Sequence, residues 1–555
     1  MNLNTQFVFD GKLKRNLIIG MVIGVVCLAW SLVGDDEYKT RFWTNWLHNS
    51  VFFTGIAFMA MFFLSAQITA FAGWNAVIKR VWEAMSQFMW VGLILVGVIV
   101  VGVWGHLHHL YHWNDPHVNI SDPTAPGFDK VLAGKKGFLN PVFFTVGTLG
   151  FLAIWYFWAY KLRQLSIAQD SQENTSFDYY KKQRKWAASF LPLGGFLSTV
   201  FLWQLVMSVD PHWYSTMFAW YSMISVWLGS ISLTVMLIIY LKSKGYLEYV
   251  TRDHLHDVGK FLFGISVFWT YLWFDQFMLI WYANNGEETI YFKERMNHYP
   301  VLFWGNLLMN FVAPFLILMR NDTKRKFGTM FFVAAIVFFG HWWDYFYMIK
   351  PGARTAAFEA TELKEGHKEG NLSSTLKEIG KTTQDAVNGA SEAVSAASEA
   401  TKAAGEVMSA LHDNTGEHAS EAAPHTDSIA PETGMTETHT EAGHSEHEAT
   451  AATAEASATH EGDAGHGEAE HAEEGHHGDK SFKLGFTLPG IQEIGVMIGF
   501  LSLFLFFFFN QLSKVSLVPL RDPYLEESLH HETGANIDGE RQLDGGDDDS
   551  GHGHH

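Results

Sequence analysis

The chain alternates between long apolar stretches and shorter polar segments. Ten of the stretches hold roughly 20 apolar residues, which is long enough to cross the hydrocarbon core of a membrane. They cover residues 16–33, 48–71, 84–105, 139–160, 187–209, 214–241, 258–282, 301–319, 327–349 and 487–511. Because lipid offers the backbone no hydrogen-bond partner, each stretch is expected to form an α-helix. The pattern therefore predicts an all-α integral membrane protein with ten transmembrane helices.

A polar insert of low complexity separates the ninth and tenth stretches. Residues 351–480 contain 12 His and hold 7 Lys and Arg against 26 Asp and Glu. This composition buries too little apolar surface to fold alone, although the Ala-rich segment 376–411 has helical character. We therefore expect four regions. They are a membrane core over 1–350, an acidic His- and Ala-rich insert over 351–480, the tenth span over 481–515 and an acidic tail over 516–555.

The charge is segregated along the chain in the same way. The formal net charge is −20, but residues 351–480 carry −19 and residues 513–555 carry −7, so the remainder is slightly basic. This distribution excludes a soluble enzyme of ordinary composition. The single cysteine, Cys27, excludes an internal disulfide, a covalently attached haem c and an iron–sulfur cluster. Phosphate-loop and dinucleotide-binding motifs are absent from the sequence, which argues against a nucleotide-driven pump.

The orientation follows from Lys and Arg in the short loops, because cytoplasmic loops carry an excess of both. One set of loops holds 18 of these residues and the opposite set holds 7. The basic set is predicted to be cytoplasmic, together with both termini, and the insert is then periplasmic. Asp35, Asp36 and Glu37 follow the first apolar stretch where a cleavage site would stand, so the first span is expected to remain uncleaved.

Ionisable residues within apolar stretches are rare and often functional. His341 and Asp344 are three residues apart and share a helical face. If the third span continues as a helix, His106, His109 and His112 also share a face. Seven candidates fall on the predicted periplasmic side: His106, His109, Asp210, His212, Asp275, His341 and Asp344.

Histidines and carboxylates bordered by aromatic residues suit the oxidation of a hydroquinone, which must lose two protons to nearby bases. Structural interpretations stay open, since His, Trp and Tyr are common in interfacial belts and Asp210 could brace its turn. A weaker set on the opposite side is interpreted mainly as helix-boundary residues. It comprises Glu83, Gln87, His254, His256, Asp257 and Lys260. Only His341 is clearly inside a span, so no b-type haem is expected, and no metal site is predicted either.

Several motifs carry a resemblance to a known family. They are His256-Asp257-Val258-Gly259-Lys260-Phe261, the aromatic run 268–274, residues 276–284 and Asp210-Pro211-His212-Trp213-Tyr214-Ser215. These motifs closely resemble the ActF family, membrane subunits of bacterial alternative complex III within the NrfD-like (polysulfide reductase membrane subunit) superfamily. The resemblance covers about residues 10–350 and the last span. The chain departs from the family pattern at Asp275, where a small polar residue is usual, and at Gly286, where proline is usual.

The resemblance implies two four-helix bundles, formed by spans two to five and six to nine, plus two peripheral helices. It also implies a quinol-oxidising respiratory complex in the bacterial inner membrane, with quinol or menaquinol as substrate. This chain would bind no redox cofactor of its own. Haem c and iron–sulfur clusters would belong to partners: an iron–sulfur subunit, multihaem and monohaem cytochromes c and a sister NrfD-like subunit. Electrons would pass to cytochrome c or a terminal oxidase, and no nucleic acid is involved.

Three hypotheses follow, in order of preference. The first is a membrane subunit of alternative complex III that contributes quinol binding or proton transfer through the seven candidates. The second is a scaffold or proton-conducting subunit of the same complex without a quinone site. The third is a stand-alone transporter, against which the lack of a visible internal repeat argues. Under the first hypothesis, Asp275→Asn or Asp344→Asn should lower quinol oxidation without loss of assembly.

Overall fold

Ten helices are long and apolar enough to cross a membrane, as the apolar stretches predict. The computed structural model describes residues 5–33, 38–124, 128–360, 381, 395 and 488–532, and the regular structure in these residues is entirely helical. The ten spans are α1 (Gly11–Trp30), α2 (Thr40–Thr69), η1 to α4 (Gly73–Trp104), α6 to α7 (Pro141–Asp170), α8 to η4 (Phe177–Val209), α9 (Thr216–Ser243), α10 (Arg252–Ala283), α12 to α13 (Pro300–Leu318), the helix over Phe327–Ala360 and α16 (Ile491–Leu512).

Several spans are assembled from consecutive helical segments, and short helices connect or follow them. The segments within spans are η1 (Gly73–Ile78), α3 (Lys79–Ser86), α4 (Met89–Trp104), α6 (Pro141–Thr145), η3 (Val146–Gly150), α7 (Phe151–Asp170), α8 (Phe177–Leu205), η4 (Met207–Val209), α12 (Pro300–Leu307), η5 (Leu308–Val312) and α13 (Ala313–Leu318). The short helices are η2 (His112–Asn114), α5 (Lys130–Lys135), α11 (Gly286–His298), α14 (Asn321–Arg325) and α17 (Leu525–Leu529). The π-helical turn η5 precedes Pro314, whose ring disrupts regular helical hydrogen bonding.

The ninth span continues past its predicted end at residue 349 and stops being described at Ala360. Alanine favours helix, and Ala353 and Ala357 are buried there. Arg354 donates a 2.8 Å hydrogen bond to the hydroxyl of Tyr299, which ties the extension to α12. The first residues of the predicted insert thus belong to the helical core. The rest of the insert, with its histidines and the segment 376–411, lies outside the described residues apart from two isolated positions, as do residues 533–555.

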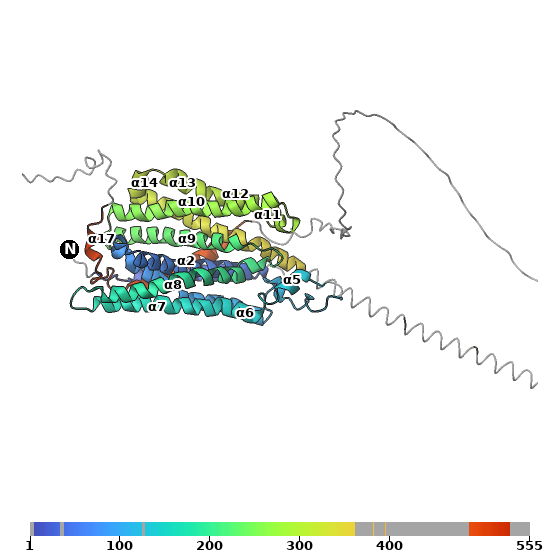
Figure 1. Cartoon of the computed structure of the whole chain (residues 1–555). Helices are drawn as coiled ribbons and strands as arrows, with labels where there is room; N and C mark the ends of the chain where they lie inside the picture. The colour runs from blue at the N-terminus through green and yellow to red at the C-terminus, as the bar shows by residue number, and fades with distance from the viewer. Residues whose placement is uncertain are drawn as a thin grey trace, which may run out of the picture. The chain divides into compact units, whose positions relative to one another are not determined.

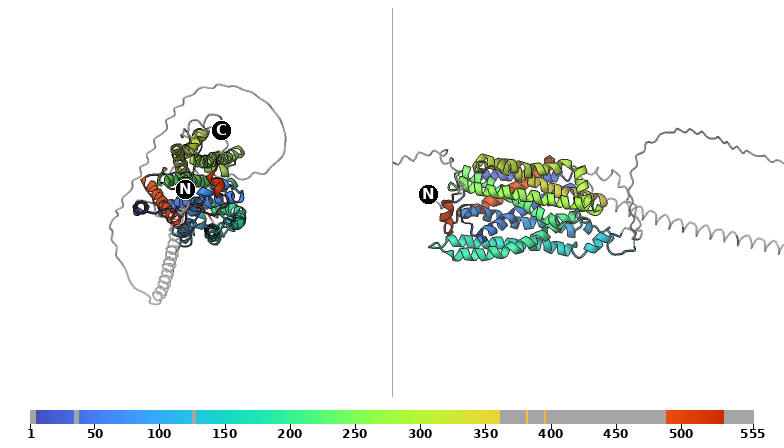
Figure 2. Two further views of the ribbon diagram at one scale, coloured as in Figure 1. Left: turned by 90° about the vertical axis from the view of Figure 1, so that its left-hand side faces the viewer. Right: turned by 45° about the horizontal axis from the view of Figure 1, so that its top comes forward.

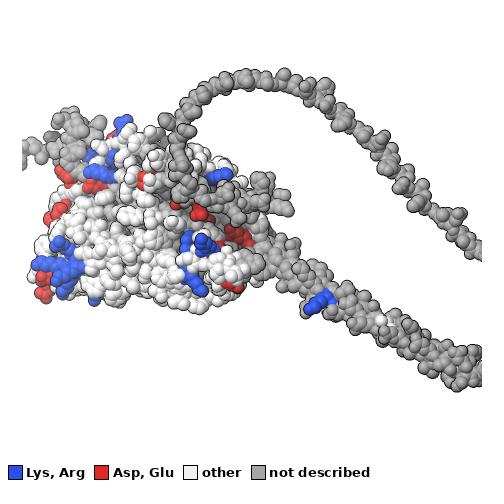
Figure 3. All heavy atoms as spheres, turned by 45° about the vertical axis from the view of Figure 1, so that its right-hand side comes forward, with Lys and Arg blue, Asp and Glu red and all other residues white. Residues whose placement is uncertain are grey.

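The helices run side by side and give the bundle two ends (Figures 1 and 2). We call the end that holds residues 5–10 and 513–532 the tail end, and the end at which the helix Phe327–Ala360 stops the insert end. Leu517 N donates to Thr5 O at 2.9 Å, so both described terminal segments meet at the tail end. On the face in Figure 3, charged residues gather toward the two ends and the middle is mostly uncharged. This distribution suits a membrane-spanning bundle.

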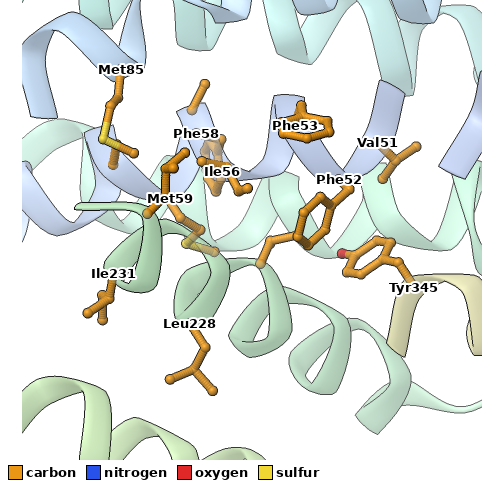
Figure 4. Packing of buried hydrophobic residues seen from close by; sticks show 14 of the residues in the cluster. Val51, Phe52, Phe53, Ile56, Phe58, Met59, Met85, Leu228, Ile231 and Tyr345 are labelled. Atoms are coloured by element: carbon orange, nitrogen blue, oxygen red, sulfur yellow. The ribbon is translucent and has the colours of Figure 1, made fainter. Parts of the chain in front are cut away.

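The core centres on α2, which is the most thoroughly buried span. Phe52, Phe53 and Ile56 on α2 are completely buried. Phe52 and Ile56 lie against Gly229 of α9, a helix on which Leu228 and Ile231 are also buried (Figure 4). Phe53 packs on the other side of α2, against Phe504 of α16. Since α2 contacts both α8 and α9, it connects the earlier spans with the later ones.

Glycines allow α1 and α16 to approach very closely. Gly20 and Gly24 on α1 are four residues apart, as are Gly495 and Gly499 on α16. A Cβ atom on Gly24 would collide with the backbone of Gly499, and one on Gly495 would collide with Cys27. Such small-xxx-small contacts are typical of packed membrane helices. The buried free thiol of Cys27 is therefore a small packing residue in this interface.

Replacing Gly24 with valine should separate α1 from α16, because the new side chain has no space. We expect a loss of about 1–3 kcal/mol in the free energy of unfolding, the usual cost of overpacking. This change in the free energy of unfolding is measured by unfolding the purified chain with SDS in mixed micelles. Gly97→Val is the matched control, since a Cβ at Gly97 in α4 meets nothing within 4 Å. Equal stability of the two variants would contradict the close contact.

Candidate functional site

A buried carboxylate, Asp344, stands at the centre of a polar cluster among spans six to nine. Its side chain is completely buried and accepts hydrogen bonds from four side chains on three other helices. The Tyr221 hydroxyl and the Asn306 amide, the latter at 2.6 Å, donate to Oδ1. Ser225 at 2.8 Å and the Trp269 indole at 3.2 Å donate to Oδ2. We call Tyr221, Ser225, Trp269, Asn306, His341 and Asp344 the Asp344 cluster.

Helical spacing explains why these residues meet. Tyr221 and Ser225 are one turn apart on α9, and His341 and Asp344 are three apart on the ninth span, so each pair shares a face. Tyr221 lies five residues after the start of α9, and Asn306 lies six after the start of α12. At 1.5 Å per residue, the cluster lies roughly 8 Å inside the insert end of these two helices.

His341 and Asp344 are connected through one hydroxyl group. Ser225 Oγ lies 3.0 Å from His341 Nδ1 and 2.8 Å from Asp344 Oδ2. A serine hydroxyl carries one proton, so when it donates to Asp344 its lone pair accepts from His341 Nδ1–H. His341 Nε2 is then an available acceptor, and it is buried without a hydrogen-bond partner in the part of the chain that the structure describes. Reversing both hydrogen bonds would move a proton between the imidazole and the carboxylate.

The cluster contains no lysine or arginine. The only potential ion-pair partner recorded for Asp344 among the described residues is His341, 3.9 Å away. Four neutral dipoles surround the carboxylate instead, which stabilise a negative charge without cancelling it. Asp344 and His341 are thus two ionisable side chains joined by a single hydroxyl group, which is the geometry that a proton relay requires.

The remaining candidates lie outside this cluster. Helix α4 ends at Trp104 and His106 has a φ of 48°, so the third span does not continue as the helix on which His106, His109 and His112 would share a face. His106 takes the left-handed conformation at the position where helices commonly end. His109 contacts Asp115 at 3.0 Å within the following loop. His106 and His109 thus lie in a loop, and His112 begins the short helix η2, so the three do not share one helix.

Asp210 is paired with a buried arginine. Arg295 Nη2 on α11 donates to Asp210 Oδ2 at 2.8 Å and to the Met348 carbonyl at 3.3 Å. The guanidinium also lies 3.4 Å from the centre of the Tyr291 ring. These contacts support the interpretation of Asp210 as a brace for its turn.

Asp275 lies on a different side of α10 from Trp269. Its side chain is half-buried, and no hydrogen bond or ion pair joins it to another described residue. Its neighbours Phe274 and Met278 are exposed, at 53% and 40%. The sequence places Asp275 at a similar depth to the Asp344 cluster. Asp275 nevertheless lies apart from the cluster, because it is on another side of α10.

His212 belongs to yet another group, with Asp129 and His112 from the loop between spans three and four. Its Nε2 lies 2.6 Å from Asp129 Oδ2. The seven candidates therefore fall into separate groups. His341 and Asp344 belong to the Asp344 cluster, Asp210 to an ion pair and His212 to a histidine–carboxylate group. The others, His106, His109 and Asp275, belong to none of these.

Four residues of the weaker set at the tail end, Glu83, His254, Asp257 and Lys260, make contacts typical of residues that brace helix ends. Glu83 pairs with Arg80 at 2.8 Å, and Asp257 pairs with Lys260 at 2.8 Å. His254 Nε2 contacts the Ser528 carbonyl at 3.0 Å, which holds the tail segment against α10. These contacts agree with the boundary interpretation.

The sequence alone does not single out several buried polar residues. Tyr221, Ser225 and Trp269 lie within apolar stretches, where such residues are common and usually structural. Asn306 and Asn310 offered a signal, because two asparagines four apart in an apolar stretch predict a polar contact. Asn310 indeed donates to the Asn306 side chain at 2.6 Å. The completely buried His48 was missed because it falls at the margin of the second apolar stretch.

The protonation of Glu294 on α11 should make the stability of the folded chain depend on pH. Burial raises the pKa of Glu294 above its ordinary value of 4.5, and Asp210 adds to this, although Arg295 opposes it. The folded chain therefore holds this proton more tightly than the unfolded chain and loses stability as the pH rises through the raised pKa. Glu294→Gln should flatten that decline in the melting temperature. Glu287 is exposed, so Glu287→Gln should keep the wild-type pH dependence of the melting temperature. If Glu294→Gln still shows the full decline at rising pH, Glu294 is not its cause.

Two described cavities lie away from the Asp344 cluster. One lies between α2, α7, α8 and α9 and is lined mainly by apolar side chains, including Phe58, Trp155 and Phe201. The other lies at the tail end beside Lys79 and Asp522. Neither is lined by His341 or Asp344.

Comparison with known proteins adds no assignment: no protein-family model matches the chain, and no curated protein is significantly similar to it.

Proposed function

We propose that the chain is a membrane subunit of a respiratory quinol oxidoreductase of the alternative complex III type, and that its Asp344 cluster transfers protons. The observation that carries this proposal is the buried carboxylate with neutral hydrogen-bond donors and a histidine linked through Ser225. Intramembrane ionisable residues are expensive and usually functional. The motif resemblance supplies the respiratory context, and the ten spans agree with it.

The insert end would face the periplasm and the tail end the cytoplasm. This orientation follows the excess of basic residues in one set of loops. We further propose the arrangement of two four-helix bundles, with the Asp344 cluster inside the one formed by spans six to nine. The cluster draws on all four of these spans, which supports the grouping.

Quinol oxidation releases two protons, and the cluster offers two bases in series. His341 Nε2 would accept a proton first, and Ser225 would relay one from His341 Nδ1 to Asp344. Tyr221, Trp269 and Asn306 would stabilise the carboxylate whenever it is charged. Electrons would leave through iron–sulfur and haem c groups in partner subunits, since this chain has one cysteine and no haem-attachment motif.

Proton transfer is the role that the Asp344 cluster itself supports, because a hydroxyl group joins its two ionisable side chains. A second candidate role rests on the exposed aromatic face of α10, on which Tyr271 and Phe274 flank the unpaired Asp275. That face could contact quinol at a boundary with another subunit. Labelling with a photoreactive quinone distinguishes the roles, because cross-links on α10 would support the second.

Gentle detergent purification of the native chain tests the proposal as a whole. We expect co-purification of iron–sulfur and cytochrome c subunits and a haem c absorption spectrum. A colourless chain without partners would overturn the respiratory assignment. Uptake activity of that chain in liposomes would then favour the transporter hypothesis.

A further inference from the structure

Four polar side chains from separate segments converge at the insert end. They are His112 in η2, Asp129 before α5, His212 in the turn between spans five and six, and Glu359 near the end of the ninth span. Ligand atoms of His112, Asp129 and His212 all lie within 4.8 Å of one another. His112 Nδ1 lies 3.4 Å from Glu359 Oε2, which brings a second carboxylate to the group.

The most informative member is His112. Its side chain is only 8% exposed, and its buried Nδ1 makes no hydrogen bond to any residue that the structure describes, although Glu359 Oε2 lies 3.4 Å away. Leaving a buried polar nitrogen unpaired costs about 1–3 kcal/mol. Glu359 Oε2 lies 3.4 Å from this nitrogen, and ligand atoms of His112, Asp129 and His212 lie within 4.8 Å of one another, so an ion bound among these residues would satisfy it.

The other residues are held in position by their own contacts. Asp129 Oδ1 accepts the Leu132 N–H at 2.9 Å, which leaves Oδ2 facing His212 at 2.6 Å. Such secondary hydrogen bonds orient metal-binding carboxylates. His212 is 43% exposed and Glu359 is 32% exposed, so an ion could enter from solvent.

The surrounding charges favour a cation. Asp129 and Glu359 contribute two carboxylates to the group itself. The nearby cations have other partners, since Arg295 pairs with Asp210 and Lys135 donates to the Pro211 carbonyl. Two imidazoles with one or two carboxylates form a donor set that suits Zn²⁺.

We propose that His112, Asp129 and His212 bind a divalent transition-metal ion, preferentially Zn²⁺, with Glu359 as a fourth ligand. Tetrahedral zinc has N and O ligands at about 2.0–2.2 Å, so its ligand atoms lie about 3.3 Å apart. The His212–Asp129 contact would open slightly and His112 would move inward. The ion would connect the loop after span three, the turn after span five and the end of span nine. The sequence analysis predicts no metal site, and this inference is independent of the proposed function.

Zinc binding to the purified full-length chain tests the site. The histidines of the insert and tail would bind zinc too, so the informative quantity is the difference between matched variants. We expect His112→Asn and Asp129→Asn each to lose one tight equivalent of Zn²⁺, measured by competition with a chelator. His106→Asn in the same loop should retain it. Equal zinc stoichiometry and affinity in all four proteins would overturn the proposal.

A second measurement uses the unaltered chain and needs no substitution. Zn²⁺ should protect His212 from carbethoxylation by diethylpyrocarbonate, as quantified by mass spectrometry, while His106 remains reactive. Unchanged reactivity of His212 at saturating Zn²⁺ would contradict the site. Protection of both histidines to the same degree would indicate dispersed surface binding and would contradict it as well.

Discussion

Under the proposed function, replacing Asp344 with asparagine is expected to lower quinol-dependent electron transfer at least about a hundredfold, the lower range for loss of an acid–base group. Asparagine keeps the size of the side chain but cannot hold the transferred proton. It also places an NH₂ group against donors such as Tyr221 and Trp269. Steady-state reduction of the electron acceptor by a short-chain quinol measures the effect.

Asp275→Asn is the comparison variant, because the first hypothesis from the sequence and a quinol contact on α10 both expect it to lower turnover, whereas the proton-transfer proposal does not. Asp275 carries the same functional group on α10, but no hydrogen bond or ion pair links it to another described residue. Under the proton-transfer proposal its turnover should stay within about twofold of wild type, a change below 0.5 kcal/mol in the activation barrier. Normal turnover in Asp344→Asn would exclude Asp344 from proton transfer.

Ser225→Ala separates a relay from a purely structural contact. It removes the hydroxyl between His341 and Asp344 but leaves both ionisable groups. A relay predicts a reduced rate with an altered pH profile, because proton exchange between the two groups is interrupted. A structural role predicts lower thermal stability with an unchanged pH profile.

Asp210→Ala should destabilise the chain by about 3 kcal/mol, the cost of removing one partner from a buried ion pair. Arg295 is completely buried and would keep its positive charge. The contacts of its guanidinium with the Tyr291 ring and the Met348 carbonyl would remain, but these groups do not neutralise it. The change in the free energy of unfolding is measured by SDS titration in mixed micelles.

Asp322→Ala is the control for Asp210→Ala. Asp322 pairs with Arg320, which is 76% exposed, and exposed ion pairs contribute about 0–1 kcal/mol. The double variant Asp210→Ala with Arg295→Met should recover part of the lost stability, because it removes the uncompensated charge. Equal effects of Asp210→Ala and Asp322→Ala would show that the Arg295 pair is not effectively buried.

Hydropathy predicted the ten spans because a membrane helix must satisfy its backbone internally, so its apolar length is visible in the sequence. It located the ninth span but placed its end at residue 349, since the alanines and the arginine that follow lower the mean hydropathy of the segment. Tertiary contacts support this extension, notably that of Arg354 with Tyr299. The end of α4 at Trp104 was also uncertain, because a polar histidine run is compatible with either helix or loop.

The pairing of His341 with Asp344 could be anticipated from their spacing of three residues. Their partners could not, because Tyr221, Ser225, Trp269 and Asn306 come from three other helices and their contacts depend on how those helices rotate and pack. Asp275 illustrates the same limit, since hydropathy reports depth along a helix but only packing decides which face is covered.

The order of amino acids therefore determines the number of spans, the separation of the acidic segments from the apolar body and the scarcity of ionisable groups within the membrane. These features depend on local composition and helical period. Packing decides that Asp344 is enclosed by donors, that Asp210 is bound to Arg295 and that His112 meets Asp129 and His212. Each of these contacts joins residues far apart in the chain, and its geometry exists only once the helices have assembled.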